Sequence, residues 1–146
     1  MHDRQKAESC LLKDLPSPKY DRDYFRRLQK QVAAYFEGAR VDFSPDMPIL
    51  LEGFSRFAIS VLAACRQIGF GQVVTYSELG REVGQPSAAR AVGNVLARNP
   101  LPLIIPCHRV MRSDGKMGGF SAPGGKRTKA RLLEHECYVL TQSKST

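Results

Sequence analysis

The chain has 146 residues, of which 42% are hydrophobic and 25% charged, a balance typical of one globular domain with a small appendage. It contains no apolar run of about 20 residues, and its N-terminus, MHDRQKAESC, lacks the apolar core of a secretory signal, so we expect neither a membrane-spanning nor a secreted protein. We expect a cytoplasmic protein, or a nuclear one in a eukaryote, and the formal net charge of +8 favours a polyanionic partner such as nucleic acid.

The first 53 residues are predicted to form a reduced N-terminal segment (1–53) with one helix and a linker. Residues 1–20 indicate a polar tail, and Asp21 is a suitable N-cap for a helix over 22–37 that ends before Gly38. Residues 39–53 contain Pro45 and Pro48 and are predicted to be extended. The apolar face of the helix is formed by Tyr24, Phe25, Leu28, Val32, Tyr35 and Phe36.

The second predicted domain, 54–146, begins with elements typical of a helix-turn-helix. A helix is expected over 55–67, with Cys65 on its buried stripe as an inert core residue, followed by a short strand over 72–76. A short helix over 77–84 ends at Gly84, and another runs from Pro86 to about Arg98. Two short helices joined by a tight turn predict a DNA-binding motif, although many unrelated helix pairs share this pattern.

The remaining residues predict an α+β fold that is mostly helical. The apolar, proline-interrupted run 101–106 indicates extended core backbone, and Asp114-Gly115 predicts a hairpin over 110–119. A Gly- and Pro-rich loop over 120–127 leads to a last helix over 128–136, with Leu132 and Leu133 directed inward.

Four cysteines occur in the chain, and one of them, Cys107, has neighbours typical of a reactive thiol. Neither Cys10, Cys65, Cys107 nor Cys137 has CxxC spacing, and the histidines complete no zinc pattern, so we expect free thiols, no metal and no cofactor.

Cys107 is followed directly by His108. A thiol needs a base or a nearby cation to react as thiolate, and a carboxylate from Glu134 or Glu136 could orient the imidazole. The alternative is a buried structural cysteine beside a surface histidine.

Several linked segments raise the weight of the reactive-cysteine interpretation. The string IPCHRV, preceded by ARNP and followed by GGFS and LLEHE, resembles the O6-alkylguanine-DNA alkyltransferase family, as do TYSELG and AARAVG. The resemblance covers roughly 54–136 without a large gap. It implies DNA repair by single-turnover transfer of an alkyl group from O6-alkylguanine, and also O4-methylthymine, in double-stranded DNA to a cysteine. It further implies nucleotide flipping and a monomeric protein.

The resemblance also implies roles for individual residues. Cys107 would accept the alkyl group, His108 would withdraw its proton through a water molecule, and Glu136 rather than Glu134 would orient His108. Asn99 would hold the turn that bears the cysteine, and Tyr76 would donate to guanine N3.

Further residues would contact substrate and DNA. In this family the recognition helix enters the minor groove, and Arg90 would fill the gap left by the flipped base. The other implied substrate contacts are Leu96, Val110, Gly118 and Ser121, and the other implied DNA contacts are Ala88, Ala89, Gly93 and Ser113.

The sequence departs from the family in two places. Only about twenty residues precede Asp21, so we expect the family's N-terminal sheet domain to be reduced or missing. Phe120 stands where some members have tyrosine, which removes a hydroxyl near the pocket rim.

Three other functions are weighed. Alkyltransferase-like proteins bind lesions without transfer and usually carry tryptophan in place of the cysteine, whereas this chain keeps Cys107 and contains no tryptophan. A helix-turn-helix regulator would need an effector or dimerisation domain. A cysteine hydrolase would need an oxyanion hole and repeated turnover.

Overall fold

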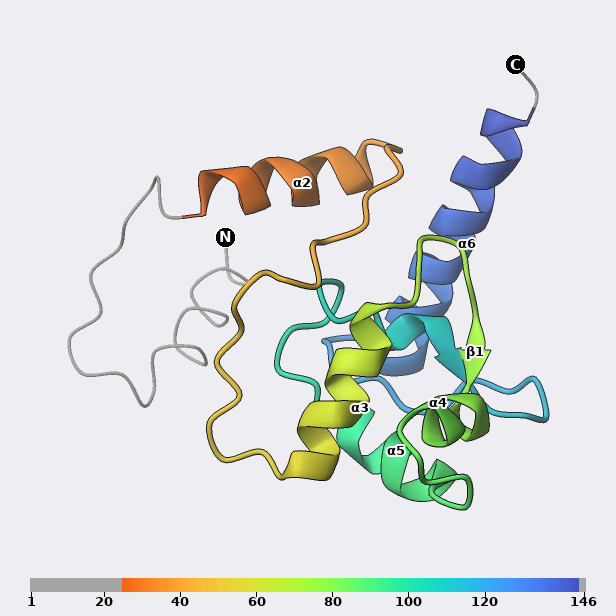
Figure 1. The fold of residues 1–146 in the computed structure, drawn as a ribbon. Coiled ribbons are helices and arrows are strands. Elements are labelled where there is room, and N and C mark those ends of the chain that lie inside the picture. Colours follow the sequence, from red (N-terminus) through yellow and green to blue (C-terminus); the bar gives the residue numbers. More distant parts are fainter. Residues whose placement is uncertain (1–24, 145–146) are drawn as a thin grey trace. The chain divides into compact units, whose positions relative to one another are not determined.

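The computed structural model describes residues 25–144, of which residues 31–144 belong to one compact unit and residues 25–30 to another. The predicted tail, Asp21 and Tyr24 lie outside the described residues. Helices dominate and the sheet has two strands, so the predicted α+β, mostly helical class is confirmed (Figure 1). The elements are α2 (Arg26–Phe36), α3 (Arg56–Arg66), β1 (Val74–Thr75), α4 (Tyr76–Glu82), α5 (Ala89–Leu96), η1 (Cys107–Arg109), β2 (Val110–Met111) and α6 (Gly125–Ser143).

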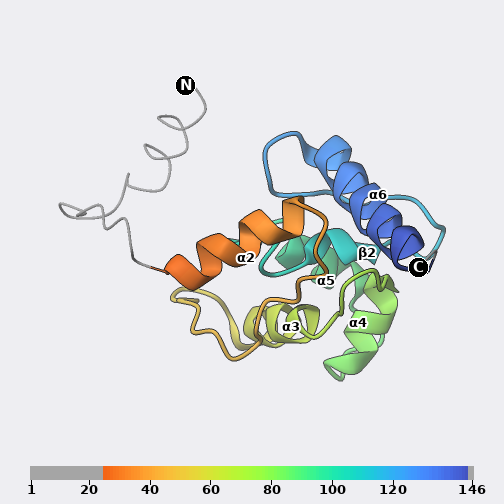
Figure 2. The ribbon, with the colours of Figure 1, turned by 90° about the horizontal axis from the view of Figure 1, so that it is seen from above.

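Helices α3, α4 and α5 pack against one another around the main hydrophobic core (Figure 2). Helix α3 begins after Ser55, whose hydroxyl accepts the Ala58 N–H at 3.1 Å. Its apolar residues recur at helical spacing, so Val61, Leu62 and Cys65 are fully buried. The predicted burial of Cys65 is therefore confirmed.

The predicted helix-turn-helix is formed by α4 and α5. Thr75 and Glu78 make a capping box that starts α4 one residue before the predicted start. Gly84 has a φ of +77°, which an L-residue with a Cβ rarely adopts, and this turns the chain toward α5. Helix α5 begins at Ala89, not at Pro86 as predicted, because Ala88 has non-helical angles and its N–H bonds to Gln85.

The predicted hairpin over 110–119 is wrong as a pair of strands. The turn forms, with the Arg112 N–H donating to the Lys116 carbonyl at 3.0 Å. However, β2 pairs in parallel with β1, which places Val74 opposite Val110 and Thr75 opposite Met111. The strand partner of β2 is therefore a segment from before α4 and not the chain that follows the turn.

The prediction of extended backbone over 101–106 is also wrong. The Ile105 N–H donates to the Leu101 carbonyl at 2.9 Å, and Leu103 has a φ of +78°, so the run folds back on itself. Side-chain bonds from Asn99 to Leu101 and Ile105 close this turn. A polar residue outside the apolar run thus overrides the extended preference of the run.

Helix α6 differs from its predicted bounds, whereas α2 ends within one residue of its predicted end at 37. Helix α6 continues seven residues beyond the predicted end at 136 and buries Val139 on the same side as Leu132. In α2 the predicted apolar stripe holds for Tyr35, which is fully buried, but Phe36 is 59% exposed. Among the residues from 25 to 144, no helix is both long and apolar enough to cross a membrane.

Candidate active site

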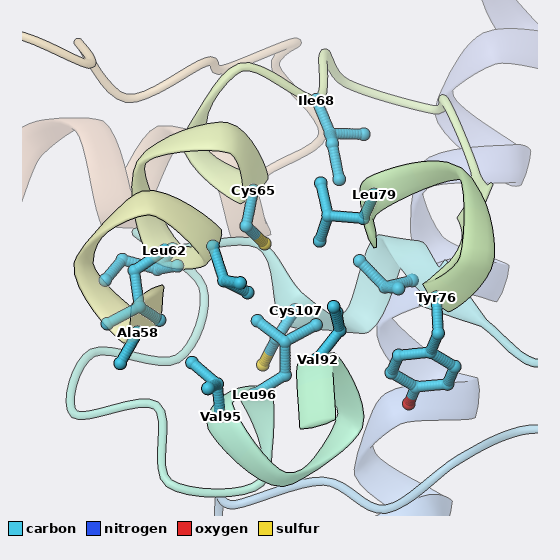
Figure 3. Packing of buried hydrophobic residues seen from close by; sticks show 13 residues of the cluster. Ala58, Leu62, Cys65, Ile68, Tyr76, Leu79, Val92, Val95, Leu96 and Cys107 are labelled. Atoms are coloured by element: carbon cyan, nitrogen blue, oxygen red, sulfur yellow. The ribbon is translucent and has the colours of Figure 1, made fainter. Parts of the chain in front are cut away.

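Cys107 is the first residue of η1 and lies inside the core. Its side chain is 3% exposed and is surrounded by apolar side chains from α3, α4 and α5 (Figure 3). Burial raises the pKa of this thiol, while a hydrogen bond from Asn99 and the charge of Lys129 act in the opposite direction. The resting group is therefore a thiol that needs a base before it can react.

Asn99 holds the backbone turn and the sulfur together. Its Nδ2 donates to the Ile105 carbonyl at 2.8 Å and to the Cys107 Sγ at 3.0 Å. Its Oδ1 accepts the Leu101 N–H at 3.0 Å. Because one buried amide makes all three contacts, it fixes where the sulfur lies relative to the turn.

His108 is completely buried and faces Glu136 from α6. The distance from His108 Nε2 to Glu136 Oε1 is 2.7 Å, and Glu134, the alternative carboxylate, is exposed. An ionised carboxylate only accepts, so Nε2 carries the proton and Nδ1 of the neutral ring has a free lone pair. Nδ1 makes no hydrogen bond with any residue that the structure describes. Burial lowers the pKa of His108 despite the raising effect of Glu136, so the ring is neutral near pH 7.

Glu136 is the centre of a buried hydrogen-bond cluster. Arg109 Nη2 donates to Oε1 at 2.9 Å, Tyr35 Oη donates to Oε1 at 2.9 Å, and the Gly71 N–H donates to Oε2 at 2.9 Å. Burial alone would raise the pKa of Glu136, but hydrogen bonds from His108 and Arg109, together with the charge of Arg109, bring it down to about 2. The carboxylate is thus ionised throughout the physiological range.

Tyr76 and Lys129 form a second polar pair beside the core. Lys129 on α6 is fully buried, and its Nζ donates to the Val110 carbonyl at 2.5 Å and to the Tyr76 hydroxyl at 3.3 Å. Burial lowers the pKa of Lys129 and raises that of Tyr76. A phenol next to an ammonium group can donate a proton and keep the resulting negative charge stabilised.

A groove of about 570 Å³ brings together six of the residues predicted to contact substrate or DNA. Its walls come from α4, α5 and the turn after β2, and they also include Asn94 and Arg112, which the sequence reasoning missed. The six predicted residues are Tyr76, Ala89, Arg90, Gly93, Ser113 and Gly118.

The other predicted contact residues lie elsewhere. Leu96 and Val110 are buried in the core and do not line the groove, so their contact with substrate stays a prediction. The Ser121 hydroxyl donates to the Asn99 carbonyl at 3.2 Å, and Ala88 caps α5 without a side-chain bond. Phe120 lines a separate cavity of about 510 Å³.

Three residues of the buried clusters were missed by the sequence reasoning. Lys129 could have been found, because it precedes Leu132 and Glu136 at spacings of three and seven on the inward face of α6. Arg109 and Tyr35 carry no local signal, since their partner Glu136 is 27 and 101 residues away. Across residues 25–144 no three metal-binding side chains come together.

The geometry defines a buried cysteine with a histidine–carboxylate pair, next to a groove on a helix-turn-helix. A family pattern described as 6-O-methylguanine DNA methyltransferase, DNA binding domain, matches residues 56–138. The methylated-DNA–protein-cysteine methyltransferase of Methanosarcina acetivorans is 39% identical over 114 residues, which is 78% of this chain and 70% of the relative.

Solved structures of relatives agree with this match. Mycobacterium tuberculosis OGT in complex with DNA is 38% identical, with a TM-score of 0.69 over 77% of this chain and 65% of that chain. S. pombe Atl1 in complex with damaged DNA containing O6-carboxymethylguanine is 34% identical, with a TM-score of 0.51 over 57% of this chain and 77% of that chain.

The chain belongs to the 6-O-methylguanine DNA methyltransferase family, because the family pattern covers more than half of its length. It is accordingly a methyltransferase of DNA repair whose partner is DNA.

Proposed function

We propose that this protein transfers the alkyl group of O6-alkylguanine, and of O4-methylthymine, in duplex DNA to the Cys107 sulfur, once per molecule. The observation that carries the proposal is the buried arrangement in which Asn99 bonds the Cys107 sulfur and the adjacent His108 bonds Glu136. It provides a nucleophile, a neutral base and a carboxylate that orients the base. All these groups come from one chain, which supports action as a monomer.

The proposed reaction begins with loss of the thiol proton. A water molecule passes this proton to the free Nδ1 of His108, while Nε2 keeps its hydrogen bond to Glu136. The positive charge formed on His108 is stabilised by that carboxylate. Burial and, to a smaller extent, the charge of Arg109 lower the pKa of His108, so the imidazole stays neutral until the thiol gives up its proton.

The thiolate then attacks the alkyl carbon in line with the bond to O6. A carbon–sulfur bond forms, the carbon–oxygen bond breaks, and its electron pair passes to the guanine ring. Tyr76 donates a proton at N3, and Lys129 stabilises the resulting phenolate. The thioether on Cys107 has no hydrolytic route back to a thiol, so the protein is consumed.

Access to the buried sulfur requires the damaged nucleotide to leave the base stack. Unstacking costs a few kcal/mol, and Arg90 on the exposed side of α5 would fill the vacated space. Ala89 and Gly93 line the same groove and are small enough for close approach of the DNA backbone. Minor-groove readout is degenerate, which suits a protein that must examine any sequence.

Intact-mass measurement tests the proposal. Duplex DNA with one O6-methylguanine should add a single methyl group to the protein, and peptide mapping should place it on Cys107. The added methyl should not exceed one equivalent at any excess of DNA.

The similarity to the S. pombe protein bound to damaged DNA favours a second candidate, lesion binding without transfer. Tight binding of the methylated duplex with an unchanged protein mass would select that function instead.

A further inference from the structure

Tyr35 belongs to α2, outside the region 56–138 that matches the family pattern, yet it contacts the catalytic cluster. Its hydroxyl donates to Glu136 Oε1 at 2.9 Å across 101 residues of sequence. The side chain is fully buried, so this hydrogen bond does not compete with bulk water. A contact of this kind ties the reactive centre to a segment that the family pattern does not include.

The Tyr35 ring is held on several sides. It lies edge-on to Phe70 with ring centroids 5.8 Å apart, and it lies against His135 at 5.0 Å. His135 Nε2 also bonds to the Tyr35 backbone carbonyl at 2.7 Å. The hydroxyl therefore has one direction available, and it points to the carboxylate.

Glu136 Oε1 is the oxygen that also faces His108. Three side chains share this atom, because His108 Nε2, Arg109 Nη2 and the Tyr35 hydroxyl all lie within 2.9 Å of it. Each donor withdraws electron density from the oxygen and weakens its bonds to the others. The strength of the His108–Glu136 bond thus depends on whether the Tyr35 hydroxyl is present.

We propose that Tyr35 is a positioning residue of the transfer reaction, whose hydroxyl orients Glu136 and limits how strongly that carboxylate raises the basicity of His108. The inference rests on the proposed function, since it assigns a role within the same site. Tyr35 itself stays protonated, because burial and the neighbouring Glu136 raise its pKa well above the ordinary value.

Other charged groups also face this cluster and must be held constant in any test. Arg109 pairs with Glu136 and reaches Asp42, the charge of Lys129 acts on His108, and Cys107 adjoins His108 in the chain. None of these groups is changed by removing one hydroxyl from Tyr35. The charged or titratable groups packed around the pair are Asp42, Cys107, Arg109, Lys129 and His135.

The test is the substitution Tyr35→Phe, which keeps the ring and removes the donor. The pKa of His108 should rise, because Glu136 Oε1 then bonds His108 more strongly. The acid limb of the rate of Cys107 alkylation by free O6-benzylguanine should move to higher pH. On that limb the rate should fall about threefold or more, the lower end of the scale of one lost hydrogen bond.

Val139→Ala provides a matched control for lost packing. Val139 is buried on α6 three residues after Glu136 and lies 4.0 Å from a Cβ built at Gly38, just beyond the end of α2. This variant should lower the melting temperature without moving the pH profile. A Tyr35→Phe profile that coincides with those of wild type and Val139→Ala would overturn the proposal.

A second measurement separates this inference from the proposed function. NMR titration reads the His108 ring directly and needs no transfer, and His108→Gln identifies its signals among the three histidines. If wild type takes up no benzyl group, the proposed function fails while the titration still tests Tyr35. Should Tyr35→Phe not fold, 3-fluorotyrosine at position 35 keeps the ring and strengthens the donor. It should lower the pKa of His108, and an unchanged titration would count against Tyr35.

Discussion

The buried cluster around Glu136 and the groove on α5 differ in how their charges are placed. The charges of the cluster are buried and paired, whereas those of the groove are exposed to solvent. In the cluster, Glu136 is 1% exposed and bonded by three side chains and one backbone N–H. In the groove, Arg90 is exposed and Arg112 is 57% exposed. Buried charges must be paired because desolvation is costly, whereas phosphate-binding charges must stay accessible.

This difference indicates that proton transfer belongs to the buried cluster and DNA contact to the groove. Burial lowers the pKa of His108, so its ring is neutral near pH 7 and can accept a proton. The groove needs no such control, because arginine remains charged at any physiological pH. A substitution in one region is therefore expected to change its property, either proton transfer or DNA binding, without changing the other.

The largest effect is expected at the sulfur itself. Cys107→Ala should abolish alkyl transfer and leave DNA binding intact, because the groove does not include this residue. Intact mass and a binding titration measure the two properties separately. Cys137→Ser, which changes an exposed thiol, is the control and should keep full transfer. A methyl group gained by the Cys107→Ala protein would show that another atom is the acceptor.

The next effect concerns the close approach of Gly118 to the Tyr76 hydroxyl within the groove. A Cβ at Gly118 would overlap the Tyr76 hydroxyl, whereas a Cβ at Gly119 meets nothing within 4 Å. Gly118→Ala should slow transfer about a hundredfold, the scale expected when a reacting group shifts by about 1 Å. Gly119→Ala should stay near the wild-type rate. Equal rates for the two variants in single-turnover assays would separate Tyr76 from catalysis.

Arg90→Ala sharpens the comparison from the DNA side. It should slow repair of duplex DNA about tenfold to a hundredfold, because flipping costs a few kcal/mol. Its reaction with free O6-benzylguanine should be unchanged, since that substrate needs no flipping. Arg98→Ala, a second exposed arginine just after α5, should weaken binding through phosphate contacts only. Equal slowing of Arg90→Ala on both substrates would argue against a flipping role.

The last prediction concerns stability and not the rate of transfer, and it distinguishes the buried from the exposed ion pair. The folded pKa of Glu136 is about 2, below its ordinary value of 4.5, so the unfolded chain binds the proton more readily. About 3 kcal/mol of stability should be present above pH 4.5 and be lost as pH falls toward 2. The lowered pKa of His108 adds a loss that begins below its ordinary value of 6.5.

Urea unfolding between pH 7 and pH 3 measures this loss. Glu136→Gln should flatten the dependence below pH 4.5. Asp114→Asn removes the exposed pair with Arg112 and should change stability by less than about 1 kcal/mol. A similar slope in Glu136→Gln and wild type would mean that another carboxylate controls acid unfolding.

Much of the fold was predictable because local rules decide it. The helical periodicity of α3, the Gly84 turn and the short helices α4 and α5 follow from residues within a few positions of one another. The motif around Cys107 and His108 was likewise recognisable from consecutive residues in the sequence. These features depend on contacts between residues that are close in sequence, so they form in the same way within the folded protein.

Only the tertiary structure decided which polar groups meet inside the molecule. Asn99 bends the run 101–106, β1 pairs with β2 in place of a hairpin arm, and Tyr35 reaches Glu136 across 101 residues. Each is a long-range or competing hydrogen bond, whose strength depends on burial and exclusion of water. The residues next to each group in the sequence do not predict such contacts, because the partner comes close and water is excluded only after folding.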